Sequence, residues 1–152
     1  MKFMKKPELS IIILNYNTKE LLEDCLNSVK KHMNEVPLEV IVSDNASNDG
    51  SPDMIRKKFP WVKLLEGENE GFSRGNNRAR PHVKGEMVLF LNPDTIVHDN
   101  VFALTVRYLK EHKDLSFYIE FIKSLCIIYP ILFIIGYAIA HFYTWILFNY
   151  TF

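Results

Sequence analysis

The sequence predicts an α/β fold: an open, parallel sheet covered by helices, followed by a hydrophobic transmembrane-like helix. Short apolar runs rich in β-branched residues alternate with amphipathic helical patterns between residues 9 and 109. This alternation is typical of βαβ units with right-handed crossovers. The charge is also unevenly placed, because all 18 Lys and Arg and all 18 Asp and Glu precede Ser124. We therefore expect a charged α/β segment followed by an apolar tail.

The first two strands and the helix between them have clear sequence boundaries. Residues 9–14 form a β-branched run that ends at Asn15 and predicts a strand buried on both faces. Thr18 offers a hydroxyl N-cap, and apolar residues then recur at helical spacing as far as Met33. After a proline loop, residues 38–42 predict the second strand.

The remaining elements follow from the same patterns. Turn formers at 43–50 separate the second strand from a helix that places Pro52 at its first helical position. Apolar runs and helical spacing then predict a strand over 61–65, a short helix ending at Ala79, a strand over 87–91 and a helix over 101–109.

Composition excludes several classes of protein. The formal net charge is zero, which argues against a broadly basic nucleic-acid-binding surface. Internal repeats are absent, which excludes collagen-like and coiled-coil classes. Cys25 and Cys126 cannot build a disulfide framework or a thiolate metal site, and the histidines show no ligand spacing. No signal-peptide core precedes the first strand, so we expect the α/β segment in the reducing cytosol.

Polar clusters end three of the predicted strands, at the edge of a parallel sheet where ligands bind. Asn15-Tyr16-Asn17 offers amides that can hydrogen-bond a nucleotide base and a ring that can stack on it. Asp44-Asn45 offers a carboxylate that can accept the N3–H of uracil or thymine. Asn92-Pro93-Asp94 offers a hard oxygen ligand for Mg²⁺ or Mn²⁺ bridged to a diphosphate. Each cluster alone is also explained as a polar turn, so the functional interpretation depends on their convergence.

The segments SIIILNYNTKELLEDCLNSV, VIVSDNASNDGS, NEGFSRGNNRAR and GEMVLFLNPDT together resemble the N-terminal half of family 2 glycosyltransferases, most closely rhamnosyltransferase-like members. The resemblance implies a Rossmann-like, A-type nucleotide-sugar-binding domain over residues 1–114 with Mg²⁺ or Mn²⁺ as cofactor. It implies that Asp94 ligates the metal. The residues that it places at the nucleotide-sugar donor are Asn15, Tyr16, Asn17, Asp44, Asn45, Asn69, Gly71, Phe72, Asn76, Asn77, Asn92 and Asp94.

The sequence departs from the family pattern in two places. Asn92 stands where many family members have the first of two aspartates, which lowers the expected metal affinity. After Leu115 the acceptor-binding region expected of the family does not follow, and Glu120 is the only acidic residue there. A general base that deprotonates the acceptor hydroxyl is therefore not identified.

The tail after a linker at 115–124 has two explanations. Residues 125–148 carry no charged side chain and could span a bilayer core of about 30 Å as a helix. Lysines before this span place the α/β domain on the cytoplasmic face of the membrane. A shift of reading frame near Leu115 explains the apolar composition and the end of the family pattern equally well.

The expected function is metal-assisted transfer of a sugar from a UDP- or dTDP-sugar to a glycan or lipid-linked acceptor. Two alternatives are a donor-binding fragment that transfers no sugar, and a non-functional truncated product. A dinucleotide-dependent oxidoreductase is disfavoured because no G-x-G-x-x-G motif follows the first strand.

Overall fold

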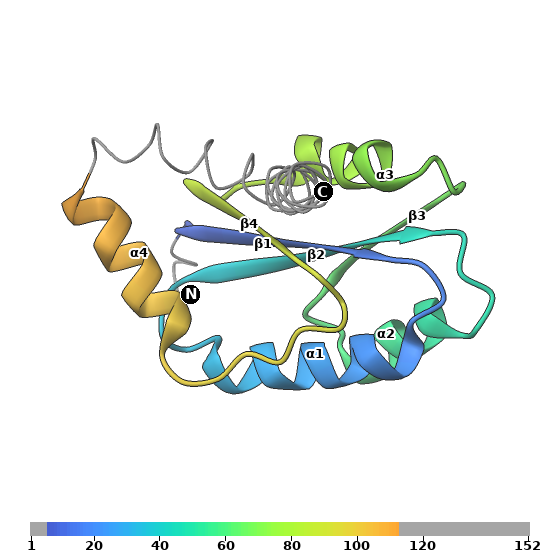
Figure 1. Cartoon of the computed structure of the whole chain (residues 1–152), viewed down its shortest axis with the longest axis horizontal. Helices are drawn as coiled ribbons and strands as arrows, with labels where there is room; N and C mark the ends of the chain where they lie inside the picture. Colours follow the sequence, from blue (N-terminus) through green and yellow to red (C-terminus); the bar gives the residue numbers. More distant parts are fainter. Residues whose placement is uncertain (1–5, 113–152) are drawn as a thin grey trace, which may run out of the picture. The chain divides into compact units, whose positions relative to one another are not determined.

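The computed structural model describes residues 6–112, which form a four-stranded parallel sheet in the order β3-β2-β1-β4. The chain divides into two units, Met1–Tyr108 and Leu109–Phe152, and the sheet lies in the first. The predicted alternation of strands and helices in an α/β fold is confirmed (Figure 1). The elements are β1 (Leu9–Asn15), α1 (Lys19–His32), β2 (Leu38–Asn45), α2 (Ser51–Lys58), β3 (Lys63–Gly67), α3 (Phe72–Ala79), a 3₁₀ turn (Arg80–His82), β4 (Met87–Leu91) and α4 (Val101–Glu111).

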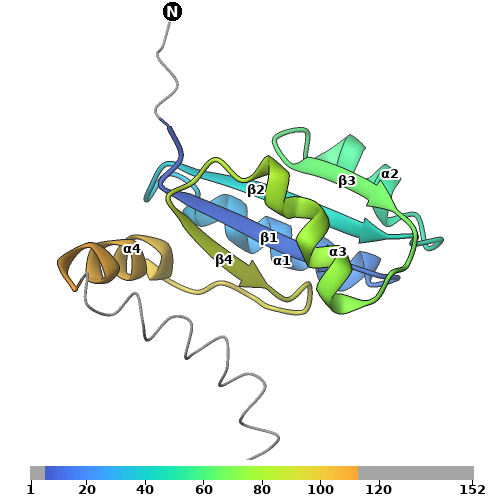
Figure 2. The same cartoon turned by 90° about the horizontal axis from the view of Figure 1, so that it is seen from above.

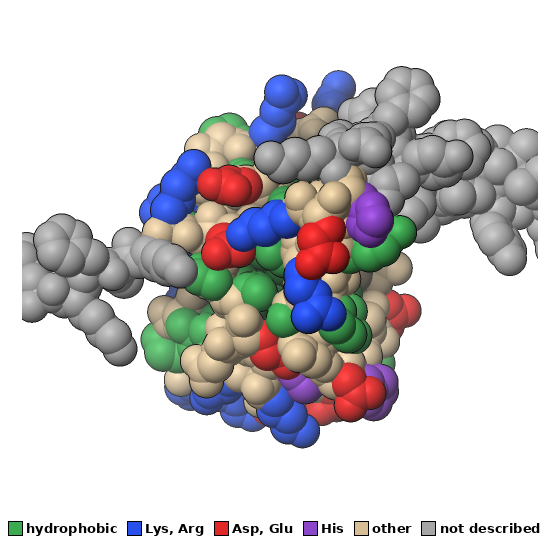
Figure 3. Space-filling model, turned by 90° about the vertical axis from the view of Figure 1, so that its left-hand side faces the viewer, with side chains coloured by type: hydrophobic (Ala, Val, Ile, Leu, Met, Phe, Trp, Pro, Cys, Tyr) green, Lys and Arg blue, Asp and Glu red, His purple; other side chains and the backbone are tan. Residues whose placement is uncertain are grey.

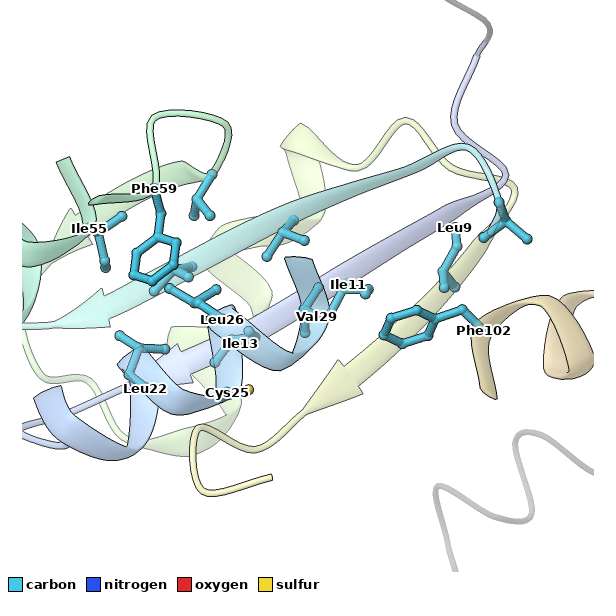
Figure 4. Packing of buried hydrophobic residues seen from close by; sticks show 14 of the residues in the cluster. Leu9, Ile11, Ile13, Leu22, Cys25, Leu26, Val29, Ile55, Phe59 and Phe102 are labelled. Carbon is cyan, nitrogen blue, oxygen red and sulfur yellow. The ribbon is translucent and has the colours of Figure 1, made fainter. Parts of the chain in front are cut away.

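Helices cover both faces of the sheet. Helices α1 and α2 lie on one face and α3 crosses the other (Figures 1 and 2). Alternate residues of β1 accordingly enter two separate hydrophobic clusters, because successive side chains of a strand point to opposite faces. Ile11 and Ile13 pack with α1 and α2, as Figure 4 shows for α1, whereas Ile12 packs with Ala79 of α3. The central strands are thus buried on both faces, as their β-branched runs predict.

Helix α4 packs on the same core as α1. Its buried residues are Phe102 and Val106, and Phe102 lies close to Leu9 of β1 (Figure 4). Strand β4 pairs with β1 alone and forms one edge of the described sheet, with Phe90 45% exposed.

Strand β2 is longer than predicted. It continues through Ser43 and Asp44 to Asn45, where the sequence predicts a loop of turn formers. Parallel pairing with β1 continues through Ser43 and Asp44, pairing with β3 continues to Asn45, and all three residues are buried. The polar side chains are tolerated inside the sheet because each has a hydrogen-bond partner within the fold.

Three smaller predictions are also wrong. Thr18 precedes α1 but makes no capping bond, because its hydroxyl donates to Oδ1 of Asn15 at 2.7 Å. Pro52 is the second residue of α2, which begins at Ser51. Strand β3 begins at Lys63 because a turn, in which N of Val62 donates to O of Phe59 at 2.9 Å, occupies the preceding residues.

No helix within residues 6–112 is long and apolar enough to cross a bilayer. The predicted linker at 115–124 and membrane helix at 125–148 lie outside the described residues.

Candidate nucleotide-sugar site

The carboxyl ends of β1 and β2 bring together the first two predicted clusters. Asn15 and Asp44 are the last paired residues of these strands, and Nδ2 of Asn15 donates to Oδ1 of Asp44 at 2.7 Å. The same amide nitrogen donates to Oγ of Ser47 at 3.0 Å, and this hydroxyl also accepts from the backbone N of Asn17 at 2.9 Å. The β1–α1 and β2–α2 loops therefore form one hydrogen-bonded unit.

The carboxylate of Asp44 is almost fully enclosed by this unit. Only 1% of the residue is exposed, and Oδ2 accepts from the backbone N of Ser47 at 2.8 Å. An ionised carboxylate has about four acceptor positions, so about two remain for another donor.

Asn45 connects the end of β2 with the loop after β3. Its Nδ2 donates to Oδ1 of Asn69 at 3.1 Å and to O of Gly71 at 3.2 Å. The close approach of α3 requires glycine at position 75, since a Cβ there would lie 2.5 Å from Leu14 and 2.9 Å from Oδ1 of Asn45. Asn45 is 3% exposed, so its amide holds the loop of residues 68–71, called the donor loop below, rather than facing solvent.

The other predicted donor residues on α3 divide between buried and exposed positions. Asn76 is 8% exposed, and its Nδ2 donates to O of Phe72 within the helix at 3.0 Å. Asn77 is exposed, and Phe72 at the first position of the helix is 68% exposed. Tyr16 beyond β1 is 51% exposed. Two aromatic side chains are therefore exposed, Tyr16 in the loop after β1 and Phe72 at the start of α3.

The third predicted cluster follows β4 at the same end of the sheet. Asn92 and Asp94 are both exposed. Two contacts attach the loop between β4 and α4 to α1. The Sγ of Cys25 lies 3.7 Å from O of Asn92, and the backbone N of Val97 donates to Oγ of Ser28 at 3.0 Å. Burial, together with the charge of Asp94, raises the pKa of the Cys25 thiol to about 11. Cys25 is therefore a neutral support for the loop.

The residues present fit a metal that is shared with a substrate. Among residues 6–112, no three His, Cys, Asp or Glu side chains gather closely enough to hold a metal ion on their own. Magnesium is commonly held by one or two carboxylates together with substrate phosphates, and the exposed carboxylate of Asp94 matches that arrangement. Asp94 alone would supply one of the ligands that such a metal needs.

Sequence reasoning did not single out Ser47 and Arg78, although both are central to the site. Ser47 accepts two hydrogen bonds that join the first two loops. Arg78 donates to O of Asp44 at 2.8 Å and to O of Glu68 at 2.7 Å. No local sequence signal identifies Arg78, because its acceptor on Asp44 lies 34 residues earlier in the chain.

Two other parts of the surface are distinct in character. An open hollow of about 400 Å³ adjoins the start of α1, and Asn17 is the only predicted site residue among those that line it: Asn17, Thr18, Lys19, Glu20, Leu21 and Asp49. At the opposite end of the sheet, Figure 3 shows basic and acidic side chains interspersed with hydrophobic ones. This face has the mixed charge expected from a net charge of zero.

Comparison with known proteins identifies the family of the chain. Residues 10–126 match the family described as glycosyl transferase family 2. The uncharacterized glycosyltransferase YfnE of Bacillus subtilis is 32% identical over 108 residues, which cover 69% of this chain and 27% of that protein. The poly(ribitol-phosphate) β-glucosyltransferase of Bacillus spizizenii is 30% identical, over 70% of this chain and 18% of the enzyme.

Solved structures share the fold. The mannosyltransferase PcManGT of Pyrobaculum calidifontis, in complex with GDP-Man and Mn²⁺, has 30% identity and a TM-score of 0.62 over 69% of this chain and 33% of its own. TarS 1–349 of Staphylococcus aureus, in complex with UDP, has 26% identity and a TM-score of 0.62 over 70% of this chain and 33% of its own. The chain thus spans about a third or less of the length of these relatives.

Proposed function

Because the chain belongs to glycosyl transferase family 2, we propose that it binds a nucleoside-diphosphate sugar at the carboxyl end of its sheet and takes part in transferring the sugar to an acceptor hydroxyl. One observation carries the proposal: direct hydrogen bonds join the predicted donor residues at the ends of neighbouring strands. Asn15 at the end of β1 donates to Asp44 of β2, and Asn45 of β2 donates to Asn69 in the loop after β3. Ligands of open parallel sheets bind at the carboxyl ends of the strands. The polar side chains buried at that end are held in place by these hydrogen bonds, so they are preorganised for a ligand.

The base of the nucleotide is proposed to lie against Asp44 and Tyr16. The carboxylate of Asp44 retains acceptor positions for a base N–H, which suits uracil, thymine or guanine. The exposed ring of Tyr16 offers a stacking surface next to it in the chain. The complexes of two structural neighbours, one with GDP-Man and one with UDP, support a nucleoside diphosphate as the ligand class.

The diphosphate is proposed to lie towards Asp94. A divalent cation held between Asp94 and the diphosphate would neutralise charge that develops on the leaving nucleotide. The chain's own contribution is to attach the loop that carries this carboxylate to α1, through the contacts of Asn92 with Cys25 and of Val97 with Ser28. The acceptor is proposed to be a glycan or lipid-linked hydroxyl; the name of one relative indicates another hydroxyl-bearing polymer, poly(ribitol-phosphate).

Calorimetric titration of the full chain in mild detergent tests this proposal. UDP, dTDP and GDP are each titrated with and without Mn²⁺. We expect at least one nucleotide to bind and Mn²⁺ to strengthen its binding. Asp94→Ala should remove the metal-dependent part of the affinity. Asp53→Ala removes an equal charge from a carboxyl on α2 that is 82% exposed, and it should bind as the unmodified chain does.

Two outcomes are decisive. If a folded chain binds none of the three nucleotides, the proposed donor site is wrong. If the chain binds a nucleotide, incubation with the matching nucleotide sugar and an acceptor separates the remaining possibilities. Release of nucleoside diphosphate that depends on the acceptor indicates transfer, and release without acceptor indicates hydrolysis. Binding without release favours the donor-binding alternative expected from the sequence.

A further inference from the structure

Arg78 makes a set of contacts that no other described side chain of α3 makes. Its Nη1 donates to the backbone O of Asp44 at 2.8 Å, and its Nη2 donates to the backbone O of Glu68 at 2.7 Å. Nη2 also lies 3.3 Å from Oδ1 of Asn45 and 3.5 Å from Oε2 of Glu70. One guanidinium therefore joins the end of β2, the loop that follows β3, and α3. The side chain is 18% exposed, so most of it is enclosed by these segments.

Gly67 provides the space in which the guanidinium lies. A Cβ at this position would be 2.4 Å from Cζ of Arg78 and 2.7 Å from its Nε. Gly67 is the last residue of β3 and pairs with Asn45 of β2, so the guanidinium lies across the end of a strand pair. The glycine is required here by the close approach of a side chain and not by its own backbone angles.

The groups that Arg78 holds are those that the donor site depends on. Asp44 carries the carboxylate proposed to face the base, and Asn45 holds Asn69 and Gly71 of the donor loop. A planar guanidinium offers five N–H donors in a fixed arrangement, so it can fix several acceptors at once. A lysine at position 78 keeps the positive charge but not this planar arrangement of donors.

We propose that Arg78 is a positioning residue of the nucleotide-sugar site. Its guanidinium, seated on Gly67, fixes residues 68–71 relative to Asp44. This inference rests on the proposed function, since it concerns the same ligand. It assigns to Arg78 no contact with the ligand itself.

Four variants of the full chain test the role: Arg78→Lys, Arg78→Ala, Gly67→Ala, and the double variant Gly67→Ala with Arg78→Ala. Nucleotide affinity is measured by calorimetry, and thermal unfolding is followed by circular dichroism. We expect Arg78→Lys and Gly67→Ala each to weaken nucleotide binding about tenfold or more, while both chains remain folded at the titration temperature. The added methyl group acts by displacing the guanidinium, so the double variant should bind no more weakly than Arg78→Ala alone.

Arg74→Ala is the matched control. Arg74 lies one turn earlier on α3, pairs with the same Glu70 at 3.9 Å, and its side chain is 77% exposed. Its removal takes the same charge from the same helix, so any loss of long-range attraction for a diphosphate appears in this variant too. We expect its affinity to stay within about twofold of the unmodified chain because exposed pairs contribute little.

The outcomes separate this inference from the proposed function. An unmodified chain that binds no nucleotide overturns both. An unmodified chain that binds, with Arg78→Lys binding equally well, overturns the positioning role alone. Additive losses for Gly67→Ala and Arg78→Ala would also overturn it, because independent effects mean that the glycine does not act through the guanidinium.

Discussion

Replacing Ser28 by alanine tests how the loop that carries Asp94 is attached to α1. Ser28 is 5% exposed, its Oγ donates to O of Cys25 at 2.7 Å, and it accepts from N of Val97 at 3.0 Å. The carbonyl of Cys25 keeps a helical partner when the hydroxyl is removed. The backbone N–H of Val97 does not, so the loss falls on the loop.

The size of the effect follows from these contacts. A buried N–H left without a partner costs about 1–3 kcal/mol. Alanine gains about 0.5 kcal/mol over serine in helix propensity, which offsets part of that loss. The net destabilisation of Ser28→Ala is therefore about 0.5–2.5 kcal/mol. In a domain of this size, each 1 kcal/mol lost corresponds to a fall in Tm of about 4–8 °C.

Trp61 provides a probe for the measurement, because its ring packs edge-on against Phe59 with ring centroids 6.0 Å apart. The chain has two tryptophans, so urea unfolding is followed by fluorescence in a Trp145→Phe background. Amide hydrogen exchange then locates the effect: Ser28→Ala should accelerate exchange at Val97. Val29→Ala removes fully buried methyl groups from the next residue of α1 and should lower stability without that selective change. Unaltered stability together with unaltered exchange at Val97 would refute the reasoning.

Three further predictions follow from the same contacts. In a Cys126→Ser background, Cys25 should resist alkylation at pH 8 until the chain unfolds, because burial raises the pKa of its thiol from 9.0 to about 11. The stability that the neutral thiol contributes is complete below about pH 9 and is lost as pH rises through 11. Burial raises the pKa of Asp49, but hydrogen bonds from its neighbours outweigh this and hold it below 3.8, so Asp49→Asn should lower Tm at neutral pH and the difference should vanish as acid protonates the native carboxyl. Tyr16→Ala should weaken nucleotide binding with little change in Tm, whereas Asn15→Ala should lower both, as paired calorimetry and thermal unfolding would show.

The alternation of strands and helices could be predicted from the sequence because each signal is local. The runs around Ile12 and Ile41 are apolar on both faces, and this pattern is typical of central strands of a parallel sheet. The end of β2 could not be predicted in the same way. Ser43 has the composition of a turn, but its hydroxyl donates to O of Gly75 at 2.7 Å, a partner 32 residues away. Tertiary hydrogen bonding here overrides local preference.

The candidate site shows the same division. Asn15 and Asp44 could be named because each lies within two residues of the end of an apolar run, and strand pairing alone places them side by side. Arg78 could not be named, since its acceptor on Asp44 is 34 residues away in the chain. Gly67, which admits its guanidinium, could not be named either, because nothing local to Gly67 indicates which side chain will lie over it.

The predicted donor residues therefore have two physical roles that the sequence alone does not separate. Asn45 is buried, and hydrogen bonds to protein groups already occupy both its amide nitrogen and its carbonyl oxygen, so it fixes geometry. Tyr16, Phe72 and Asp94 are exposed at the same end of the sheet and remain available to a ligand. A buried network that is satisfied before the ligand arrives need not reorganise on binding, so less of the binding free energy is lost in ordering the site. The buried amides thus hold the site in place, and the exposed groups face the ligand. Arg78 contributes to the first role through its hydrogen bonds to Asp44, Asn45 and Glu68.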